Sequence, residues 1–365
     1  MTLYIGLMSG TSLDGVDGVL IDFAADGAPR LRGHRHEPFV ASLRDELLAL
    51  HSAGDDELHR AAIAAQGVAQ AYASVINALL FDGGELARDV RAIGAHGQTV
   101  RHRPDARYTL QLLDGALLAE LAGIDVVCDF RSRDVAAGGQ GAPLAPAFHA
   151  AVFGAATEAR ALLNWGGIAN LTLLAPGADP IGFDCGPANA LLDAWCQRHT
   201  GRAFDDEGRW AASGRVVAPL LATLLAEPWL DVSPPKSTGR DLFNLDWLDR
   251  HLAGIDAAPA DVQATLAAFT VETSARHFER HVAAARRLFV CGGGARNDHL
   301  MRLLAARLPG VAVETTAALG VPVDQVEAAA FAWLAREFIE GRPANRPGVT
   351  GARGARRLGA LYPAQ

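Results

Sequence analysis

The segment from Tyr4 to Phe23, YIGLMSGTSLDGVDGVLIDF, constrains the fold more than any other part of the chain. Two apolar runs, Tyr4 to Met8 and Val16 to Phe23, flank a polar stretch that contains Asp14-Gly15, which predicts two antiparallel strands joined by a turn. Glycines in this turn let the backbone approach a ligand closely, and its hydroxyl and N–H groups can bind phosphate oxygens. A nucleotide phosphate is the expected ligand, although an ordinary glycine-rich turn fits this segment equally well.

Length and charge narrow the class of protein. A chain of 365 residues exceeds the usual size of one hydrophobic core, so two domains with a cleft between them are expected. The net charge of -8 argues against nucleic acid or an acidic membrane surface as a partner, because such partners require a basic face. The residues Met1 to Tyr4 lack the basic segment of a secretory signal, so a cytoplasmic location is expected.

Cysteine and lysine are both scarce. The four cysteines are scattered, which suits buried thiols in a reducing compartment, and no CxxC pair supports a zinc site at Cys185, Cys196 and His199. Lys236 is the one lysine among 33 basic residues, and it lies in the loop-like stretch PPKSTGR. Either a compact ammonium ion is required there, or this lysine has survived by chance on a surface loop.

The first half of the chain alternates between strand and helix patterns. Ser42 and Asp55 are expected to cap two helices, and residues His96 to His102 are expected to form a polar loop after a buried strand, where an α/β sheet usually binds its ligand. Strands are predicted at Leu31–Val40, Ala92–Ala95, Tyr108–Leu113 and Val126–Phe130, and helices at Leu43–Leu50, Asp56–Leu80 and Gly115–Ala122.

Arginines and glycines mark the predicted domain crossing. Arg131 and Arg133 precede the glycine-rich stretch Gly138 to Pro143, and they form either a solvated turn or a fork of donors for a substrate carboxylate. The first domain is predicted to comprise residues 1–134, completed by 326–365, and the second domain residues 135–325.

The second half repeats the opening theme. The apolar run Ala161 to Ile168 ends in Gly166-Gly167 and is followed by a second apolar run, Leu171 to Leu174, which predicts a second phosphate-type hairpin. Asp184 then lies between a short strand and a helix at Ala190–His199, where it is either a catalytic base or a helix cap.

A glycine triplet closes the pattern. The buried strand Leu288 to Cys291 runs into Gly292-Gly293-Gly294 ahead of a helix at Asp298–Leu308, an arrangement typical of a phosphate or adenosine cradle, although a tight turn also explains it. Glu327 lies near the start of a helix, where a carboxylate is favourable for structural reasons alone. Further helices are predicted at Val216–Ala226, Leu245–Ala253, Asp261–Ala285 and Val326–Glu340, a strand at Val311–Glu314, and a packed surface segment at Leu358–Tyr362.

Two glycine-bearing hairpins and a late glycine triplet resemble the sugar kinase, chaperone ATPase and actin superfamily. The resemblance implies an α/β protein with two domains, each built on a ribonuclease H-like mixed sheet, and nucleotide in the cleft between them. Many members carry aspartates near the positions of Met8 and Asn164 that serve a metal ion. Their absence here favours coordination of Mg²⁺ through water over direct protein ligands, so no metal-binding residue is predicted.

Longer motifs resemble one branch, the anhydro-N-acetylmuramic acid kinase family, over nearly the whole chain. The matching runs include GLMSGTSLDGVD, AHGQTVRH, LLDGALLAE, DFRSRDVAAGGQGAPLAP, NWGGIANLT, GFDCGPAN, PPKSTGRDLFN, FVCGGGARN, VEAAAFAWLA and VTGARG. This resemblance implies a bacterial, homodimeric enzyme of cell-wall recycling, which uses ATP and water to convert 1,6-anhydro-N-acetylmuramic acid into N-acetylmuramic acid 6-phosphate.

The resemblance also implies roles for individual residues. Asp184 is the expected general base, and the expected contacts with the sugar come from Gln98, Arg131, Asn189 and Glu327, with Arg131 directed at the lactyl carboxylate. The residues expected to bind ATP are Gly10, Thr11, Ser12, Leu13, Asp14, Gly15, Val16, Asp17, Gly166, Gly167, Gly292, Gly293 and Gly294.

Two alternatives remain. A kinase of a free amino sugar would use the same residues but would place no water in its product. A sugar-responsive binding protein or chaperone-like ATPase would use domain closure as a signal and would not turn over any sugar.

Overall fold

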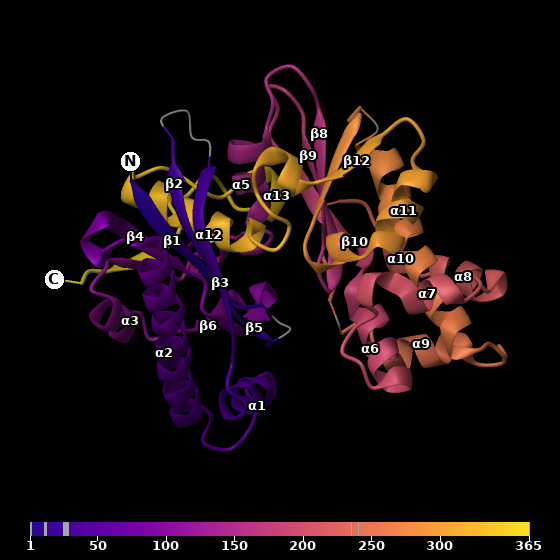
Figure 1. The fold of residues 1–365 in the computed structure, drawn as a ribbon, viewed down its shortest axis with the longest axis horizontal. Helices are drawn as coiled ribbons and strands as arrows, with labels where there is room; N and C mark the ends of the chain where they lie inside the picture. Colours follow the sequence, from indigo (N-terminus) through magenta and orange to yellow (C-terminus); the bar gives the residue numbers. More distant parts are fainter. Residues whose placement is uncertain are drawn as a thin grey trace. The chain divides into compact units, whose positions relative to one another are not determined.

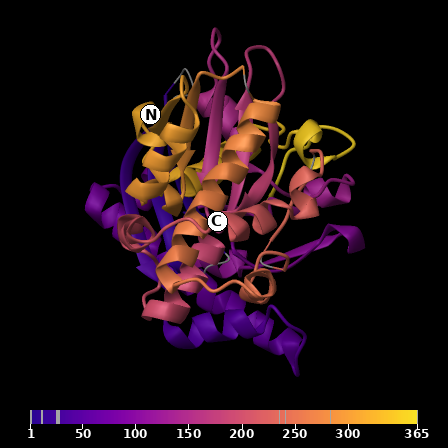
Figure 2. The same ribbon diagram turned by 90° about the vertical axis from the view of Figure 1, so that its right-hand side faces the viewer.

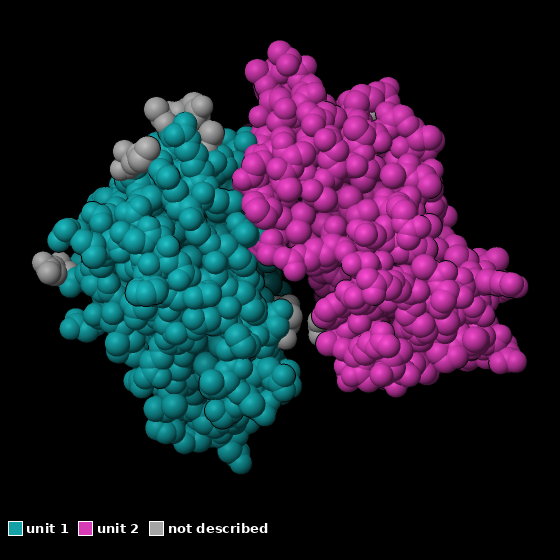
Figure 3. Space-filling view, in the orientation of Figure 1, with its two compact units in different colours: residues 1–152, 325–365 teal, residues 153–324 magenta. Residues whose placement is uncertain are grey.

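The computed structural model describes residues 2–10, 13–24, 29–234, 236–239, 241–282 and 284–364. The chain divides into two compact units, residues 1–152 with 325–365 and residues 153–324, which Figure 3 colours separately. Residues 135–152, which the sequence pattern assigns to the second domain, thus lie in the first unit.

The first unit contains a six-stranded mixed sheet in the order β13-β7-β4-β1-β2-β3 (Figure 1). Strands β1, β4 and β7 are parallel, whereas β2 is antiparallel to β1, β3 to β2, and β13 to β7. The predicted hairpin is confirmed, with Met8 opposite Asp17. The strands are β1 (Leu3–Met8), β2 (Gly15–Phe23), β3 (Pro29–Pro38), β4 (Val90–Ala95), β7 (Val126–Cys128) and β13 (Ala360–Tyr362).

Helices cover both faces of this sheet, and glycines set how closely they approach. Gly6 and Gly94 lie side by side on β1 and β4, and a Cβ on either would collide with a main-chain carbonyl of α12 (Val326–Ile339). A Cβ on Gly18 of β2 would instead meet Val75 of α2 (Glu57–Gly83) on the opposite face. The remaining helices of this part of the chain are α1 (Ala41–Ala49), α3 (Gly115–Ala122), α4 (Ser132–Ala136), α5 (Ala145–Phe153) and α13 (Pro347–Thr350).

Helix α2 is long and apolar enough to meet the length and composition of a membrane-spanning helix, and it is the one such helix within the described ranges. Half of its apolar window is buried inside the protein. The buried face includes Val68, Tyr72, Val75 and Leu79, and it packs against β2 and β3. The apolarity of α2 is therefore explained by its position in the core of the first unit.

The second unit contains a five-stranded sheet in the order β10-β9-β8-β11-β12. Strands β8, β9 and β10 form an antiparallel meander, and β8, β11 and β12 are parallel. The five strands are β8 (Arg160–Trp165), β9 (Ile168–Leu174), β10 (Ile181–Pro187), β11 (Arg287–Cys291) and β12 (Ala312–Thr315).

Both units therefore share one topology. In each, the first three strands of the unit form an antiparallel meander, and the next two main strands extend the sheet in parallel with its first strand. The edge strand β13 is the addition in the first unit. This repeated mixed sheet confirms the predicted α/β fold class, with two ribonuclease H-like units.

Helices of the second unit pack against its sheet and against one another. Helix α10 (Pro259–His281) contacts β9 and β10, and α11 (Asp298–Arg307) contacts β12; both are orange in Figure 2. The other helices are α6 (Asn189–Thr200), α7 (Arg209–Ser213), α8 (Ala218–Leu225) and α9 (Leu245–Leu252).

Several local predictions were wrong. Ser42 and Asp55 cap neither helix, because α1 begins after Val40 and α2 after Asp56, and neither preceding side chain makes a capping bond. The predicted loop from His96 to His102 is largely strand β5 (Gln98–Arg103), which pairs with β6 (Tyr108–Leu112) in a separate two-stranded sheet. The sequence pattern did not predict this strand, because its partly exposed positions carry polar residues that are also typical of a loop.

Candidate active site

The tip of the first hairpin connects β1 to β2, and hydrogen bonds to the Gly10 carbonyl anchor it. The backbone N–H of Leu13 donates to the Gly10 carbonyl over 3.3 Å, and Leu13 is buried, which anchors the tip to the core. Gln98 Nε2 also donates to the Gly10 carbonyl, over 3.0 Å. Thr11 and Ser12 lie outside the described residues. Gln98 thus joins the first strand of the small sheet to the predicted phosphate-binding segment.

The carboxyl-terminal end of that segment is part of β2. Gly15 and Val16 are buried strand residues, so they contribute backbone and packing at the base of the tip. The Asp17 side chain, one third exposed, lies 3.3 Å from His34 Nε2 and 3.1 Å from His36 Nδ1 on β3. Asp17 is therefore oriented by its neighbours on the adjacent strand.

A buried polar network lies beneath this tip. Ser9 Oγ lies 2.9 Å from the Tyr72 hydroxyl and donates to the Gly97 carbonyl. His96 Nδ1 lies 3.2 Å from the Ser9 carbonyl, which can only accept, so the imidazole carries its proton on Nδ1 and Nε2 is an acceptor. Burial lowers the pKa of His96 to about 3, with a contribution from Arg131. The imidazole is therefore neutral at physiological pH.

Arg131 donates to that imidazole. Its Nε and Nη2 lie 3.1 and 3.0 Å from His96 Nε2, and its Nη1 donates to the Gly141 carbonyl over 2.8 Å. These contacts use three of the five N–H groups of a guanidinium. Burial lowers the pKa of Arg131 to about 10, and the nearby charge of Glu327, in the first turn of α12, opposes this shift. The structure thus brings Gln98, His96, Arg131 and Glu327 into one region of the first unit.

Asp134 is a structural residue that the sequence pattern did not single out. Its carboxylate is fully buried and accepts hydrogen bonds from Gly141 N, Asn345 Nδ2 and Thr350 Oγ1 at 2.8, 2.7 and 2.8 Å. These contacts tie the glycine-rich stretch to the closing VTGARG motif. The presence of both motifs among the family-like runs was the available signal for this contact.

In the second unit, the second hairpin and the glycine triplet meet at Asn189. Gly166-Gly167 form the two-residue turn between β8 and β9, and Asn189 N donates to the Gly166 carbonyl over 3.0 Å. Its Nδ2 donates to the Trp165 carbonyl over 2.9 Å, and its side chain borders Gly293 and Gly294. Asn189, predicted to bind the sugar, therefore lies among the residues predicted to bind nucleotide.

The glycine triplet has a conformation that other residues adopt poorly. Gly292 has φ +78°, and a Cβ there would collide with Asn164 Oδ1 and lie 2.9 Å from the Trp165 backbone. Gly293 and Gly294 begin a short 3₁₀ helix, and the Asn297 side chain then caps α11 by accepting from Leu300 N over 3.0 Å. The triplet therefore provides a close backbone approach ahead of a helix, as expected for a nucleotide cradle.

Asp184 lies on β10, at a register shift between Asp184 and Gly186. Its Oδ2 accepts from Thr238 N over 2.9 Å, and its own N–H donates to the Lys236 carbonyl over 3.2 Å. Burial raises the pKa of Asp184 to about 6, opposed by the Thr238 N–H group and the charge of Lys236. The helix-cap alternative is wrong, because α6 follows Ala188 without a side-chain cap. Asp184 combines partial burial with a pKa near neutrality, which suits a general base.

The cysteines and possible metal ligands lie apart from one another. All four cysteines are buried and free, as the scattered pattern predicts. Within the described ranges, no group of three or more histidine, cysteine, aspartate or glutamate side chains is arranged to hold a metal ion. The candidate site therefore offers a partly buried carboxylate at Asp184, a partly buried guanidinium at Arg131 and glycine-rich backbone.

Comparison with known proteins gives a consistent result. A family model described as "Anhydro-N-acetylmuramic acid kinase" matches residues 2–364. Proteins of that name are 62% identical over 366 residues in Bordetella petrii and 59% identical over 372 residues in Variovorax paradoxus. Each match covers 99% of this chain, with 96% and 99% of the respective relatives.

Solved structures are more distant. The component A of (R)-2-hydroxyglutaryl-CoA dehydratase from Acidaminococcus fermentans has a TM-score of 0.49 at 14% identity, covering 91% of this chain and 96% of that protein. A ROK family glucokinase from Streptomyces griseus has a TM-score of 0.44 at 15% identity, covering 92% and 99%. These likenesses are too weak to support an argument about function.

Proposed function

The chain belongs to the anhydro-N-acetylmuramic acid kinase family, and we propose that it opens the 1,6-anhydro ring of N-acetylmuramic acid with water while phosphorylating O6 from ATP. The products are N-acetylmuramic acid 6-phosphate and ADP. The reaction recycles a fragment of cell-wall peptidoglycan. The observation that carries the mechanism is the partly buried Asp184 carboxylate, whose pKa of about 6 suits a base that removes a proton from water.

The substrate dictates a coupled reaction. Because O6 is bonded to C1 in the anhydro sugar, no free hydroxyl is available for phosphorylation. Water attacks C1 and forms a C1–O bond while the C1–O6 bond breaks, and O6 takes the γ-phosphoryl group as its bond to the ADP oxygen breaks. The phosphoryl group thus replaces the acid that a glycosidase would supply, so one carboxylate base is sufficient.

Asp184 is proposed to accept the proton of the attacking water. The Thr238 N–H group donates to Oδ2, and Oδ1 is proposed to receive the proton. Desolvation destabilises the carboxylate relative to the neutral acid and so raises its pKa. The carboxylate therefore binds a proton more strongly than a fully solvated aspartate does, and it is still deprotonated near neutral pH. General-base catalysis of this kind contributes about 10²–10⁴-fold.

Substrate binding is proposed for four side chains. Arg131 is proposed to contact the lactyl carboxylate with the N–H groups not used on His96 and Gly141, and Gln98 to contact the sugar with its buried Oε1, which has no partner among the described residues. Glu327 is proposed to lie near the reacting water or Asp184. Asn189 is proposed to contact the sugar from its position beside the glycine triplet.

ATP is proposed to bind through backbone-rich segments, namely Gly10 to Asp17, Gly166-Gly167 and Gly292 to Gly294. Binding in a cleft between domains of residues 1–134 with 326–365 and 135–325 stays a prediction. Mg²⁺ is proposed to accompany ATP, held by its phosphates and by water. A homodimer in the cytoplasm is also proposed, in keeping with the family resemblance.

The test is mass spectrometry of the product formed from 1,6-anhydro-N-acetylmuramic acid and ATP in ¹⁸O-labelled water. We expect one heavy oxygen at C1 and none in the phosphoryl group. A parallel incubation of unlabelled N-acetylmuramic acid 6-phosphate in the same water measures exchange at the anomeric carbon. Phosphorylation without heavy oxygen at C1, or phosphorylation of open-ring sugars alone, would instead identify a kinase of free amino sugars.

A further inference from the structure

The single lysine of the chain is buried, and its ammonium group is fully engaged. Lys236 is 9% exposed, and its Nζ lies 2.9 Å from the Leu230 carbonyl, 3.4 Å from the Trp229 carbonyl and 2.8 Å from His277 Nε2. It also lies 4.2 Å from the centre of the Trp229 ring, close enough for a cation–π contact. An ammonium ion has three N–H donors, and three acceptors surround it here.

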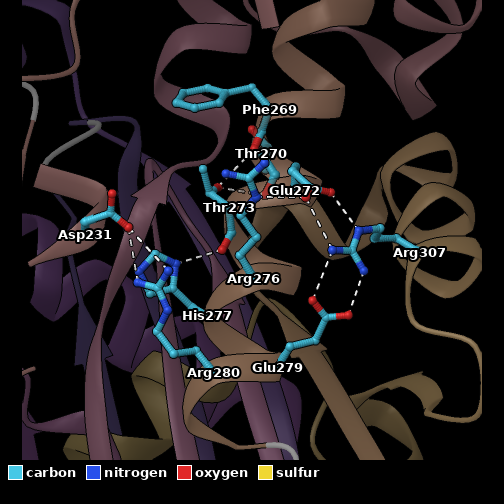
Figure 4. Close-up of polar contacts among 10 residues, drawn as sticks. All are labelled: Asp231, Phe269, Thr270, Glu272, Thr273, Arg276, His277, Glu279, Arg280 and Arg307. Carbon is cyan, nitrogen blue, oxygen red and sulfur yellow. Dashed lines mark hydrogen bonds and ion pairs between the residues drawn. The ribbon is translucent and has the colours of Figure 1, made fainter. Parts of the chain in front are cut away.

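His277 can accept from Lys236 because its proton is on the other nitrogen. Figure 4 shows the His277 imidazole directed at the Thr273 carbonyl, with Nδ1 at 2.7 Å, whereas Nε2 lies 3.1 Å from the Leu230 carbonyl. The shorter contact places the proton of the neutral imidazole on Nδ1, which leaves Nε2 to accept from Lys236 at 2.8 Å. Burial lowers the pKa of His277 to about 4, with Lys236 contributing. A neutral imidazole therefore lies beside a cation without charge repulsion. These three acceptors surround a single nitrogen atom, an arrangement that suits an ammonium group and not the planar guanidinium of arginine.

The main chain of the same residue contacts the proposed base. The Lys236 carbonyl accepts from Asp184 N, and two residues later Thr238 N donates to Asp184 Oδ2. The ammonium group thus fastens the segment 236–239 to α10 and to the Trp229-Leu230 backbone, while the segment itself holds Asp184 by two hydrogen bonds.

We propose that Lys236 is a positioning residue for the general base: its buried ammonium fixes the segment that orients the Asp184 carboxylate and also supplies positive charge nearby. This inference rests on the proposed role of Asp184. The surface-loop explanation for the surviving lysine is wrong, since the side chain is buried.

The charges around this pair favour the same conclusion. Besides Asp184, the titratable groups near Lys236 are Cys185 on β10, Asp231, and His277, Arg280 and His281 on α10; of these, Cys185 also lies next to Asp184. The Thr238 N–H group and Lys236 both act to lower the pKa of Asp184. Removal of Lys236 loses the charge and loosens the segment that carries the N–H donor, so both changes should raise that pKa.

The test compares the pH dependence of kcat/KM in Lys236→Met with that of the unaltered enzyme. Asp184 must be deprotonated to act as a base, so activity rises with pH through its pKa, and we expect this acid limb to move to higher pH in the variant. We also expect kcat to fall about 10- to 100-fold, since slight misplacement of a reacting group can cost about 10²-fold. The KM for ATP should change less than kcat.

Arg276→Met is the matched control, because Arg276 lies on α10 next to His277 and is half exposed in an ion pair with Glu272 (Figure 4). It should retain the unaltered acid limb. If Lys236→Met does not fold, Lys236→Gln, which keeps an N–H donor but no charge, carries the test with a smaller shift in the same direction. An acid limb at its original pH in the folded lysine variant overturns the proposal, because a purely structural lysine would reduce the active fraction without moving the limb.

The proposed function and the proposed role of Lys236 are tested by different measurements. If the unaltered enzyme gives no labelled sugar phosphate in ¹⁸O-labelled water, the reaction assignment is wrong. If it gives that product and the acid limb of Lys236→Met is unshifted, the role of Lys236 alone is wrong.

Discussion

Each unit contains a buried, neutral imidazole that accepts a hydrogen bond from a cation. In the first unit His96 accepts from Arg131, and in the second His277 accepts from Lys236. In both, Nδ1 donates to a main-chain carbonyl and burial lowers the pKa of the imidazole, to about 3 and about 4 respectively. The two units share their main strand order, and in each a neutral imidazole accepts a hydrogen bond from a cationic side chain.

The two pairs differ in what they hold. Arg131 and His96 fix backbone, at Ser9 beneath the hairpin tip and at Gly141 in the glycine-rich stretch. The Lys236 pair instead holds the segment that orients a carboxylate, Asp184. The first pair therefore contacts backbone next to the predicted phosphate-binding segment, and the second contacts the segment that holds Asp184.

The third strand of each meander explains this division. In the first unit β3 is largely exposed, and its histidines contact the partly exposed Asp17. In the second unit β10 is mostly buried and carries Asp184. Asp17 on β2 thus remains partly exposed beside an exposed β3, whereas desolvation on β10 raises the pKa of Asp184 to about 6.

The largest difference between the two units is expected when Asp184 and Asp17 are each replaced by asparagine. Asp184→Asn should reduce kcat about 10²–10⁴-fold, because the general base is lost, while ATP binding survives. Asp17→Asn should weaken ATP binding with a smaller loss of kcat. Steady-state kinetics and calorimetric titration of ATP measure both. Near-normal turnover in Asp184→Asn would falsify the assignment of the base.

The same Asp184→Asn variant should be more stable than the unaltered protein at pH 7.5. A carboxyl whose pKa is raised from 3.8 to about 6 on folding contributes its full stability below pH 3.8, and that stability is lost as pH rises through about 6. The gain for the amide is on the order of 2–3 kcal/mol at pH 7.5, at 1.36 kcal/mol per pKa unit. Chemical unfolding at several pH values should show this gain shrinking between pH 6 and 4. A gain independent of pH would contradict the raised pKa.

Replacement of the cation in the first unit should affect the sugar more than the nucleotide. Arg131→Met should raise the KM for the anhydro sugar about 10- to 100-fold, since hydrogen bonds to charged groups contribute about 1.5–3 kcal/mol. The methyl ester of the substrate should bind the unaltered enzyme as weakly as the acid binds Arg131→Met, and the two changes together should cost little more than one.

Arg88→Met is a suitable control, because Arg88 is an exposed arginine of the same unit. Its KM for both substrates should be unchanged. If the ester and the Arg131→Met change weaken binding independently, Arg131 acts on the backbone network and not on the carboxylate.

Sequence patterns anticipated the elements that depend on local signals. The two hairpins, the strand before the glycine triplet and helix α3 are found where apolar runs and turn residues place them. Asp184 was identifiable through its motif, but its register shift and its contact with Thr238 join residues far apart in the chain. No periodicity encodes a contact of that kind.

The failures have the same origin. Strand β5 was hidden because its polar face is exposed and its partner lies across a turn. The contact of Asn189 with the Trp165 carbonyl was likewise not predictable from the motif that contains Asp184, and the role of Asn189 in sugar binding stays a prediction. The importance of Lys236 was visible only as a compositional oddity, since its acceptors are main-chain carbonyls and a histidine from another helix.

The smallest expected effect separates close approach from backbone strain in the second unit. Gly292 and Gly310 both have φ near +80°, but a Cβ on Gly292 would collide with Asn164, whereas nothing lies within 4 Å of a Cβ on Gly310. The free energy of unfolding should fall by about 1 kcal/mol in both alanine variants, because alanine is strained in a left-handed backbone conformation. It should fall by about 1–3 kcal/mol more in Gly292→Ala through overpacking. Only Gly292→Ala should weaken ATP binding, because it displaces the turn between β11 and the 3₁₀ helix. Equal losses of stability and unchanged ATP affinity in both variants would mean that the triplet is an ordinary tight turn, and the nucleotide role would then rest on the hairpins alone.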